Sequence, residues 1–260
     1  MAGRLEGKIA LVTGIAAGIA TEIALKFARE GATVFGCDIN AAGAEATVAQ
    51  ARDEGLTIHS MHPIDLTKPA DVDRFVEHAG KAYGRIDILA NVAAIPPHLV
   101  KIAEMDYETE WVPTMAGEID LVFLATKAAW PYLVASGNAS IINFASVSAF
   151  RGSINFGMAA HCAGKAAVLG MTRQFAVEGG PHNIRANTIA PGMVMTPQTA
   201  HAGAIQEDSP ARANIMNRLL IKRLGKTEDI AWCAVYLASD EASWVTGSDF
   251  VLDGGFSSIT

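Results

Sequence analysis

The segment after the first apolar run of the chain contains glycines at a spacing that suits phosphate binding. Residues 9–12 are apolar, and residues 13–20 read TGIAAGIA before a helical pattern begins. A phosphate must approach the backbone closely at such a turn, and the following helix offers unpaired N–H groups and the positive end of its dipole. Gly14 and Gly18 are therefore candidate phosphate-binding residues, although two glycines at this spacing are also typical of a plain tight turn.

A carboxylate lies at the end of the second apolar run. Asp38 directly follows residues 33–37, and a carboxylate at that place accepts hydrogen bonds from a ribose 2′-OH and repels a 2′-phosphate. No arginine or lysine closely follows Asp38, and none lies in the glycine loop. We therefore expect NAD(H) rather than NADP(H) as the ligand. The alternative is that Asp38 is a solvated acid at the end of a strand.

A second pair of residues suits acid–base chemistry. His161 and Lys165 lie four residues apart in segment 157–179, which has a helical pattern, and residues at that spacing share one face of a helix. The side chain of histidine titrates near neutrality without help from its surroundings. A lone histidine on a helix is more often a packing residue, so the pair is a catalytic candidate only in a suitable structural context.

These residues require a fold that brings the ends of several strands together. Short apolar runs alternate with helical patterns along the chain, which predicts an α/β fold with a doubly wound, mostly parallel sheet and helices on both faces. The predicted strands are 9–12, 33–37, 57–62, 86–90, 140–144, 184–189 and 248–252. The predicted helices are 19–29, 41–54, 69–82, 107–135, 157–179, 209–220 and 227–238. Residues 1–260 form a single domain, in which we expect residues 192–220 to be a substrate lid.

Composition and charge argue against several classes of protein. Half of the 260 residues are apolar and 18% are charged, as in a globular protein with a thick core. A net charge of −7, with no basic stripe, argues against a nucleic-acid binder. We find no signal peptide and no uninterrupted apolar stretch of about 20 residues, so we expect a cytoplasmic protein without a membrane partner. The histidines have no metal-ligand spacing, and no metal site is expected.

Further motifs give the chain a resemblance to the short-chain dehydrogenase/reductase family that runs from Arg4 almost to the C-terminus. Residues 13–20 resemble the family's TGxxxGxG with alanine at the last position, and residues 65–67 its DxT. Residues 91–94 resemble a degraded NNAG, and residues 187–196 match NxxxPGxxxT. The resemblance implies a Rossmann-type domain whose NAD site is formed at these motifs. The implied cofactor-binding residues are Gly14, Ile15, Gly18, Ile19, Asp38, Asp65, Leu66, Asn91, Ala93, Lys165, Pro191, Gly192, Val194 and Thr196.

The sequence departs from the family pattern at the catalytic end. The family's relay of Asn, Ser, Tyr and Lys implies Ser146 as the serine, with Ser148 as the alternative, and Lys165 as the lysine. His161 occupies the position of the tyrosine, and Glu118 that of the asparagine when the long helix is counted without gaps. A lysine disfavours a protonated imidazole and a carboxylate favours it, so Glu118 could offset Lys165. The alternative is that Glu118 is an acid on the surface of its helix.

Three functions are open at this point. The first is an NAD-dependent oxidoreductase of a secondary alcohol or its ketone, in which Ser146 binds the substrate oxygen, His161 moves the proton and Lys165 holds the cofactor ribose. The second is a non-redox lyase, hydrolase or dehalogenase that uses His161 and Glu118. The third is a cofactor-binding protein without catalytic activity, because fold alone does not decide function.

Apolar residues on the segments expected to frame the pocket favour a mainly apolar small-molecule substrate. They are Pro96, Leu99, Phe150, Phe156, Met193, Met195 and Met216. The resemblance also implies a homotetramer. Small residues on the helix 157–179 suit close helix packing, either within one chain or between chains. They are Ala160, Ala163, Gly164 and Ala167.

Overall fold

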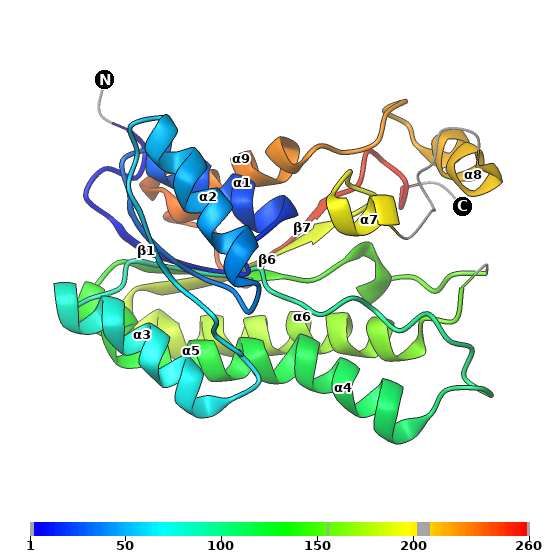
Figure 1. Cartoon of the computed structure of the whole chain (residues 1–260), viewed down its shortest axis with the longest axis horizontal. Helices are drawn as coiled ribbons and strands as arrows, with labels where there is room; N and C mark the ends of the chain where they lie inside the picture. The colour runs from blue at the N-terminus through cyan, green and yellow to red at the C-terminus, as the bar shows by residue number, and fades with distance from the viewer. Residues whose placement is uncertain (1–2, 155, 202–208, 259–260) are drawn as a thin grey trace.

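The computed structural model describes residues 3–154, 156–201 and 209–258, and in this part of the chain seven parallel strands form one sheet (Figure 1). The strands are β1 (Ile9–Thr13), β2 (Thr33–Cys37), β3 (Ile58–Met61), β4 (Ile88–Asn91), β5 (Ala139–Phe144), β6 (Ile184–Pro191) and β7 (Asp249–Leu252). Their order across the sheet is β3-β2-β1-β4-β5-β6-β7. The predicted doubly wound α/β fold is confirmed. The winding reverses between β1 and β4, and sheets of this kind bind ligands at the carboxyl ends of the strands beside that reversal.

Helices cover both faces of the sheet (Figure 1). One face carries α1 (Gly18–Arg29), α2 (Ala41–Asp53) and α9 (Thr227–Ala238), and the other carries α3 (Pro69–Tyr83), α5 (Leu121–Ser136) and α6 (Ala159–Gly179). Successive side chains of a strand point to opposite faces. In β1, Ala10 and Val12 belong to one core cluster and Ile9 and Leu11 to the other. Because both faces are buried, each strand is a short, continuous apolar run that can be recognised in the sequence.

The stretch predicted as one helix over 107–135 contains two π-helical turns. They are η1 (Tyr107–Trp111) and η2 (Ala116–Asp120), with α4 (Val112–Met115) between them and α5 after them. A π turn takes one residue more than an α turn, and such turns are frequent at functional sites. Glu118 lies in η2, and it is 1% exposed. This carboxylate therefore lies in the interior of the protein, on a π turn.

By length and composition, the helical stretch Tyr107–Ser136 could cross a membrane. Its buried side chains pack in the same core cluster as α3 and the sheet, among them Leu121, Ala125 and Leu133. A core helix of a globular domain has the same composition, so this feature is weak evidence for a membrane span. The absence of a membrane partner stays a prediction.

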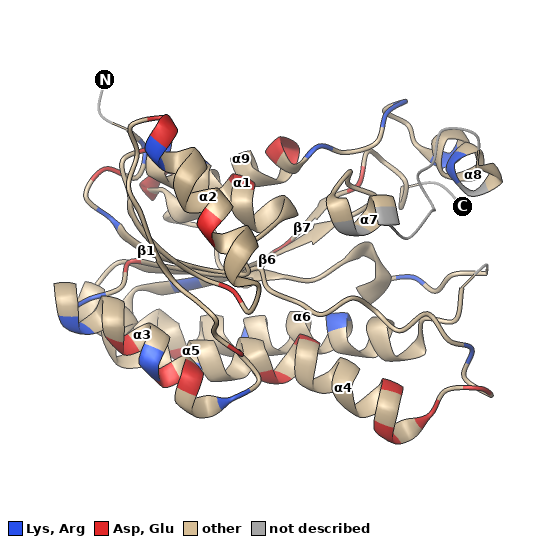
Figure 2. Cartoon of the chain, viewed as in Figure 1, with Lys and Arg blue, Asp and Glu red and all other residues tan. Residues whose placement is uncertain are grey.

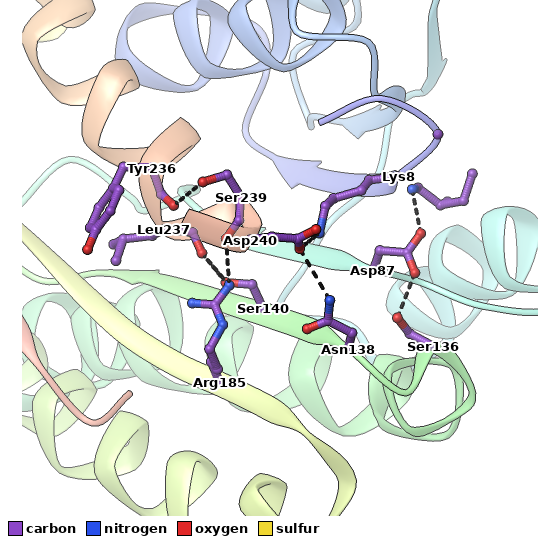
Figure 3. Close-up of polar contacts among 12 residues, drawn as sticks. Lys8, Asp87, Ser136, Asn138, Ser140, Arg185, Tyr236, Leu237, Ser239 and Asp240 are labelled. Carbon is purple, nitrogen blue, oxygen red and sulfur yellow. Dashed lines mark hydrogen bonds and ion pairs between the residues drawn. The ribbon is translucent and has the colours of Figure 1, made fainter. Parts of the chain in front are cut away.

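Charged side chains lie mainly on helices and loops, and the strands carry few of them (Figure 2). At the amino ends of the strands, polar contacts connect the layers (Figure 3). Asp87 accepts hydrogen bonds from the N–H of Ile9 at 2.8 Å and from the hydroxyl of Ser136 at 2.6 Å. Arg185 of β6 is buried and donates to the carbonyl oxygens of Leu237 and Ser239 at the end of α9. Burial lowers the pKa of the Arg185 guanidinium. These contacts stabilise the amino ends of the strands, on the side of the sheet away from their carboxyl ends.

Two short helices lie beyond the carboxyl end of β6, in the stretch 192–220 that was predicted to be a lid. They are α7 (Pro197–His201) and α8 (Pro210–Arg218) (Figure 1). Residues 202–208 of the predicted lid lie outside the described residues. The stretch is anchored beside the sheet, because Val194 forms a β-bridge with Gly225, and Met193 and Met216 pack against Leu219 and Leu224. Short 3-10 turns complete the described chain, at Val147–Ala149 (η3), Gly180–His182 (η4) and Asp240–Ala242 (η5).

Candidate active site

A cavity of about 570 Å³ lies at the carboxyl ends of the strands. This volume is within the usual range for a ligand site. The loops after β1 through β6 all contribute to its wall. The sequence-predicted residues that line it are Gly14, Gly18, Ile19, Asp38, Asp65, Leu66, Ala93, Glu118, Ser146, His161, Lys165, Pro191, Gly192, Val194 and Thr196. The fold thus brings residues from these six loops, from η2 and from α6 to one site.

The glycine loop has the geometry expected of a phosphate-binding turn. Gly14 has a φ of +82° and Gly18 a φ of +67°, backbone conformations that side chains with a Cβ rarely adopt. A Cβ on Gly14 would lie 2.9 Å from the Cα of Ala93, so a side chain there would collide with the loop after β4. The N-cap residue of α1 is Ala17, which has no side-chain acceptor for the first N–H groups of the helix. These N–H groups can serve an anionic ligand in the cavity.

Two acids stand at the same end of the cavity, and local hydrogen bonds fix both. Asp38 accepts from the N–H of Ala16 at 2.9 Å and from the N–H of Asn40 at 2.8 Å. Asp65 accepts from the backbone N–H of Thr67 at 3.0 Å and from its hydroxyl at 2.7 Å. The Thr67 hydroxyl is the main reason that the pKa of Asp65 is lowered. Both carboxylates are therefore held in place before any ligand binds.

Two predicted cofactor residues do not line the cavity. Ile15 is fully buried below the glycine loop, where it packs on Gly36 of β2, whose hypothetical Cβ would lie 2.4 Å from the Ile15 Cδ1. Asn91 is 1% exposed, and its amide donates to Thr126 and to Asn143. Ile15 therefore supports the loop from beneath, and Asn91 joins β4 to α5 and β5. The sequence motif does not distinguish such supporting side chains from those that face the ligand.

Glu118 and His161 are paired at the opposite end of the cavity. The Glu118 Oε1 lies 2.5 Å from the His161 Nδ1, and the side chains are 0% and 12% exposed. The alternative that Glu118 is a surface acid is therefore wrong. An ionised carboxylate only accepts hydrogen bonds, so Nδ1 carries the proton that is shared with it. The other ring nitrogen, Nε2, is then free to accept a proton from a ligand.

Lys165 and Ser146 complete this end of the cavity. The Lys165 ammonium donates to the carbonyl oxygen of Phe144 at 3.1 Å. Burial lowers the pKa of Lys165, and the negative charge of Glu118 opposes that effect. The Ser146 Oγ accepts from the N–H of Ser148 at 3.1 Å, which leaves the Ser146 hydroxyl proton available for a ligand. Ser146 lines the cavity and Ser148 does not, so the first choice of serine agrees with the structure.

The apolar wall of the cavity comes mostly from residues that the sequence did not single out. Ile95, Pro97 and Leu121 line it, together with Phe144 and Ala145. Most of them lie just after the ends of β4 and β5, and this position was the available signal. The residues expected to frame the pocket lie elsewhere, since Met193 and Met216 pack in their own cluster. The exposed ones are Pro96, Leu99, Phe150, Phe156 and Met195.

Several proteins of known name resemble this chain over nearly its whole length. Residues 14–257 match the family model described as enoyl-(acyl carrier protein) reductase. The chain is 38% identical to 3-oxoacyl-(acyl-carrier-protein) reductase FabG of Thermotoga maritima, across 97% of this chain and 98% of that protein. It is 36% identical to D-threitol dehydrogenase of Mycolicibacterium smegmatis, across 97% and 94% of the two chains. A solved 7α-hydroxysteroid dehydrogenase, complexed with NADH and 7-oxo glycochenodeoxycholic acid, is 30% identical with a TM-score of 0.89, across 97% and 95%.

Proposed function

The chain belongs to the short-chain dehydrogenase/reductase family, and from that premise we propose that it transfers hydride between a secondary alcohol, or its ketone, and NAD, with His161 as the proton carrier. It is an oxidoreductase, as its named relatives are. The observation that carries the proposal is the Glu118–His161 pair, which lies in the same cavity as the glycine loop, Ser146 and Lys165.

Three observations support NAD as the cofactor. The conformation of Gly14 leaves the backbone open to a phosphate, the first turn of α1 has free N–H groups, and the position of Asp38 suits a ribose without a 2′-phosphate. In this proposal the glycine loop holds the pyrophosphate, Asp38 the adenosine ribose and Lys165 the nicotinamide ribose. A nicotinamide held there would supply the hydride acceptor for an alcohol or, in its reduced form, the hydride donor for a ketone.

The proton is moved by the chain's own residues. The Ser146 hydroxyl donates a hydrogen bond to the substrate oxygen, and the His161 Nε2 removes the hydroxyl proton as the carbinol hydrogen leaves as hydride. The alcohol loses one proton and one hydride and becomes the ketone. The imidazolium that forms is stabilised by the Glu118 carboxylate on its other nitrogen, in the way that buried carboxylates assist histidine bases in other enzymes. In ketone reduction the same atoms act in reverse.

We expect the substrate to be uncharged and mainly apolar. Among the described residues that line the cavity, Lys165 is the one Lys or Arg, and its proposed partner is the cofactor. Ile95, Pro97 and Leu121 give the wall an apolar character.

The homotetramer and the cytoplasmic location stay predictions. Ala160 and Gly164 are buried within the chain, which leaves Ala163 and Ala167 as the small residues of α6 available for contact between chains.

A cofactor-reduction assay tests the proposal. The protein is incubated with NAD+ and a panel of apolar secondary alcohols, and the absorbance of the reduced cofactor is followed. We expect reduction with at least one alcohol, and at least about a hundredfold slower reduction in His161→Phe. Substrate consumption without cofactor reduction would support a non-redox reaction instead. Cofactor binding with no turnover of any alcohol or ketone would support a protein without catalytic activity.

A further inference from the structure

Gly164 of α6 lies directly against the carboxylate of Glu118. A Cβ built on Gly164 would be 2.3 Å from the Glu118 Oε2, 3.1 Å from its Cβ and 3.2 Å from its Cδ. The backbone of Gly164 is ordinary helix, without the positive φ that would call for glycine. Glycine costs helix stability relative to alanine, and at Gly164 the close contact with Glu118, rather than the backbone conformation, accounts for the glycine.

We propose that Gly164 is a positioning residue whose missing side chain provides the space for the Glu118 carboxylate and so keeps that carboxylate on the Nδ1 of His161. The consequence for catalysis rests on the proposed function. The steric part of the inference does not, because it follows from the packing of η2 against α6. Of the four small residues of α6 noted in the sequence, Gly164 thus has a role within the chain.

The way in which Glu118 is held makes its position sensitive to this space. Its Oε1 is hydrogen-bonded to His161, but its Oε2 is buried and has no hydrogen-bond partner among the described residues. Packing against Gly164 therefore has to keep the second oxygen in place. A methyl group at residue 164 would push the carboxylate away from the imidazole, and a hydrogen bond weakens steeply with distance and angle.

The charges around Glu118 indicate which measurements will respond. Three titratable groups on α6 interact with the Glu118 carboxylate. It contacts His161, and its negative charge acts to raise the pKa values of Cys162 and Lys165. Asp120 of η2 is exposed, and the other acids of the cavity, Asp38 and Asp65, line its cofactor end. Displacing the carboxylate therefore removes the negative charge nearest to the imidazole and leaves Lys165 beside it.

The first test is a stability cycle that needs no activity. Gly164→Ala should lower the Tm by about 4 °C or more, whereas in the Glu118→Ala background the same change should leave the Tm unchanged or raise it. Gly170→Ala is the matched control, since Gly170 is on the same helix and its Cβ would meet no atom within 4 Å. It should be neutral or stabilising in both backgrounds. If Gly164→Ala does not fold but the double variant does, the inference is supported.

The second test measures which ring nitrogen of His161 carries the proton. NMR of the histidine ring nitrogens should place the His161 proton on Nδ1 in the unmodified protein and shift it toward Nε2 in Gly164→Ala. The pH–rate profile should move to lower pH in Gly164→Ala as it does in Glu118→Gln, and the double variant should move no further than either single variant.

Two results would overturn the inference. One is a loss of stability from Gly164→Ala that persists in the Glu118→Ala background, and the other is an unchanged His161 tautomer in folded Gly164→Ala. Failure of the proposed function looks different. In that case no alcohol would reduce NAD+ in the unmodified protein, while the stability cycle and the NMR measurement would still decide the role of Gly164.

Discussion

The carboxylate of Asp38, at the end of β2, accepts a hydrogen bond from the N–H of Ala16 in the glycine loop, with 2.9 Å between the nitrogen and Oδ2. The N–H of Asn40 donates to the other carboxylate oxygen at 2.8 Å. The acid is therefore held at the rim of the cavity in a fixed position relative to the turn that would bind a pyrophosphate. A 2′-phosphate entering there meets a negative charge that cannot easily rotate away.

From this contact we predict that NAD(H) binds at least about tenfold tighter than NADP(H), a difference of roughly 1.4 kcal/mol. Asp38→Ala should reduce the ratio of the two affinities. The lost contact to Ala16 should also weaken the binding of both cofactors. Titration of both cofactors against both proteins measures the ratio. Asp53→Ala, at an exposed acid of α2, is the control and should leave the ratio unchanged. A preference of the unmodified protein for NADP(H) would contradict the assignment.

His161→Phe should abolish alcohol oxidation and leave cofactor affinity within about twofold, because the imidazole supplies the proton acceptor but no cofactor contact. In the unmodified protein, oxidation should depend on pH, because the proton carrier has to be able to accept the hydroxyl proton. Stopped-time assays across a pH series, together with cofactor titration, measure both effects. A variant that keeps most of its activity would show that another group or a water chain moves the proton.

Glu118→Gln should shift the pH–rate profile of alcohol oxidation to lower pH. The carboxylate stabilises the protonated imidazole across a 2.5 Å contact, and an amide of the same shape does so far less. A shift of one pH unit would correspond to about 1.4 kcal/mol. Glu104→Gln is a suitable control at an exposed acid. A profile that does not move in Glu118→Gln would mean that the contact has no part in proton transfer.

His161→Tyr should give a poor enzyme as long as Glu118 is present. A phenol needs the positive charge of Lys165 to lose its proton near neutrality, and the neighbouring carboxylate opposes that charge. Glu118→Asn together with His161→Tyr should therefore be more active than the two single changes predict by addition. The values of kcat/KM for the four proteins measure the coupling. Strict additivity would show that the two positions act independently.

Asp229→Asn should reduce stability near neutral pH but not near pH 2. Hydrogen bonding from Arg223 is the main reason that the pKa of Asp229 is lowered to about 2, and the carboxylate also accepts from the N–H of Lys226 at the start of α9. A lowered pKa means that the folded state binds the proton less readily than the unfolded chain. The stabilisation is therefore complete above the unfolded pKa of about 3.9 and disappears as the pH falls toward 2.

We expect a loss of about 1 kcal/mol near neutral pH, because the Arg223 ion pair is partly exposed and screened by solvent, and an amide oxygen at residue 229 can still accept from the N–H of Lys226. Thermal unfolding at neutral pH and near pH 2 should show a difference between the two proteins that vanishes in acid. Arg223→Met removes the same ion pair and leaves the carboxylate at the start of α9, so its loss of stability should be similar to that of Asp229→Asn. A much larger loss in Asp229→Asn would mean that the negative charge at the start of α9, and not the ion pair, dominates.

Much of the fold could be predicted from local sequence. The strands of a buried parallel sheet are continuous apolar runs such as residues 9–13, and the helices between them follow a period that such runs do not have. Gly14 and Gly18 mark the turn that needs a positive φ, and Asp38 marks the end of the next strand. Ile15 and Asn91 show the limit, because a motif names a segment and the packing decides which side chains face the ligand.

Local sequence patterns are enough to place His161 and Lys165 on one face of a helix and to bring the carboxyl ends of the strands together, because helix period and strand alternation are local properties. Only the tertiary structure decided that Glu118 is buried on the Nδ1 of His161, 43 residues away in the chain. Glu118 lies on a π turn of one helix, and its carboxylate packs against Gly164 of another. Neither can be read from a periodic pattern, since both are consequences of how two helices pack against each other.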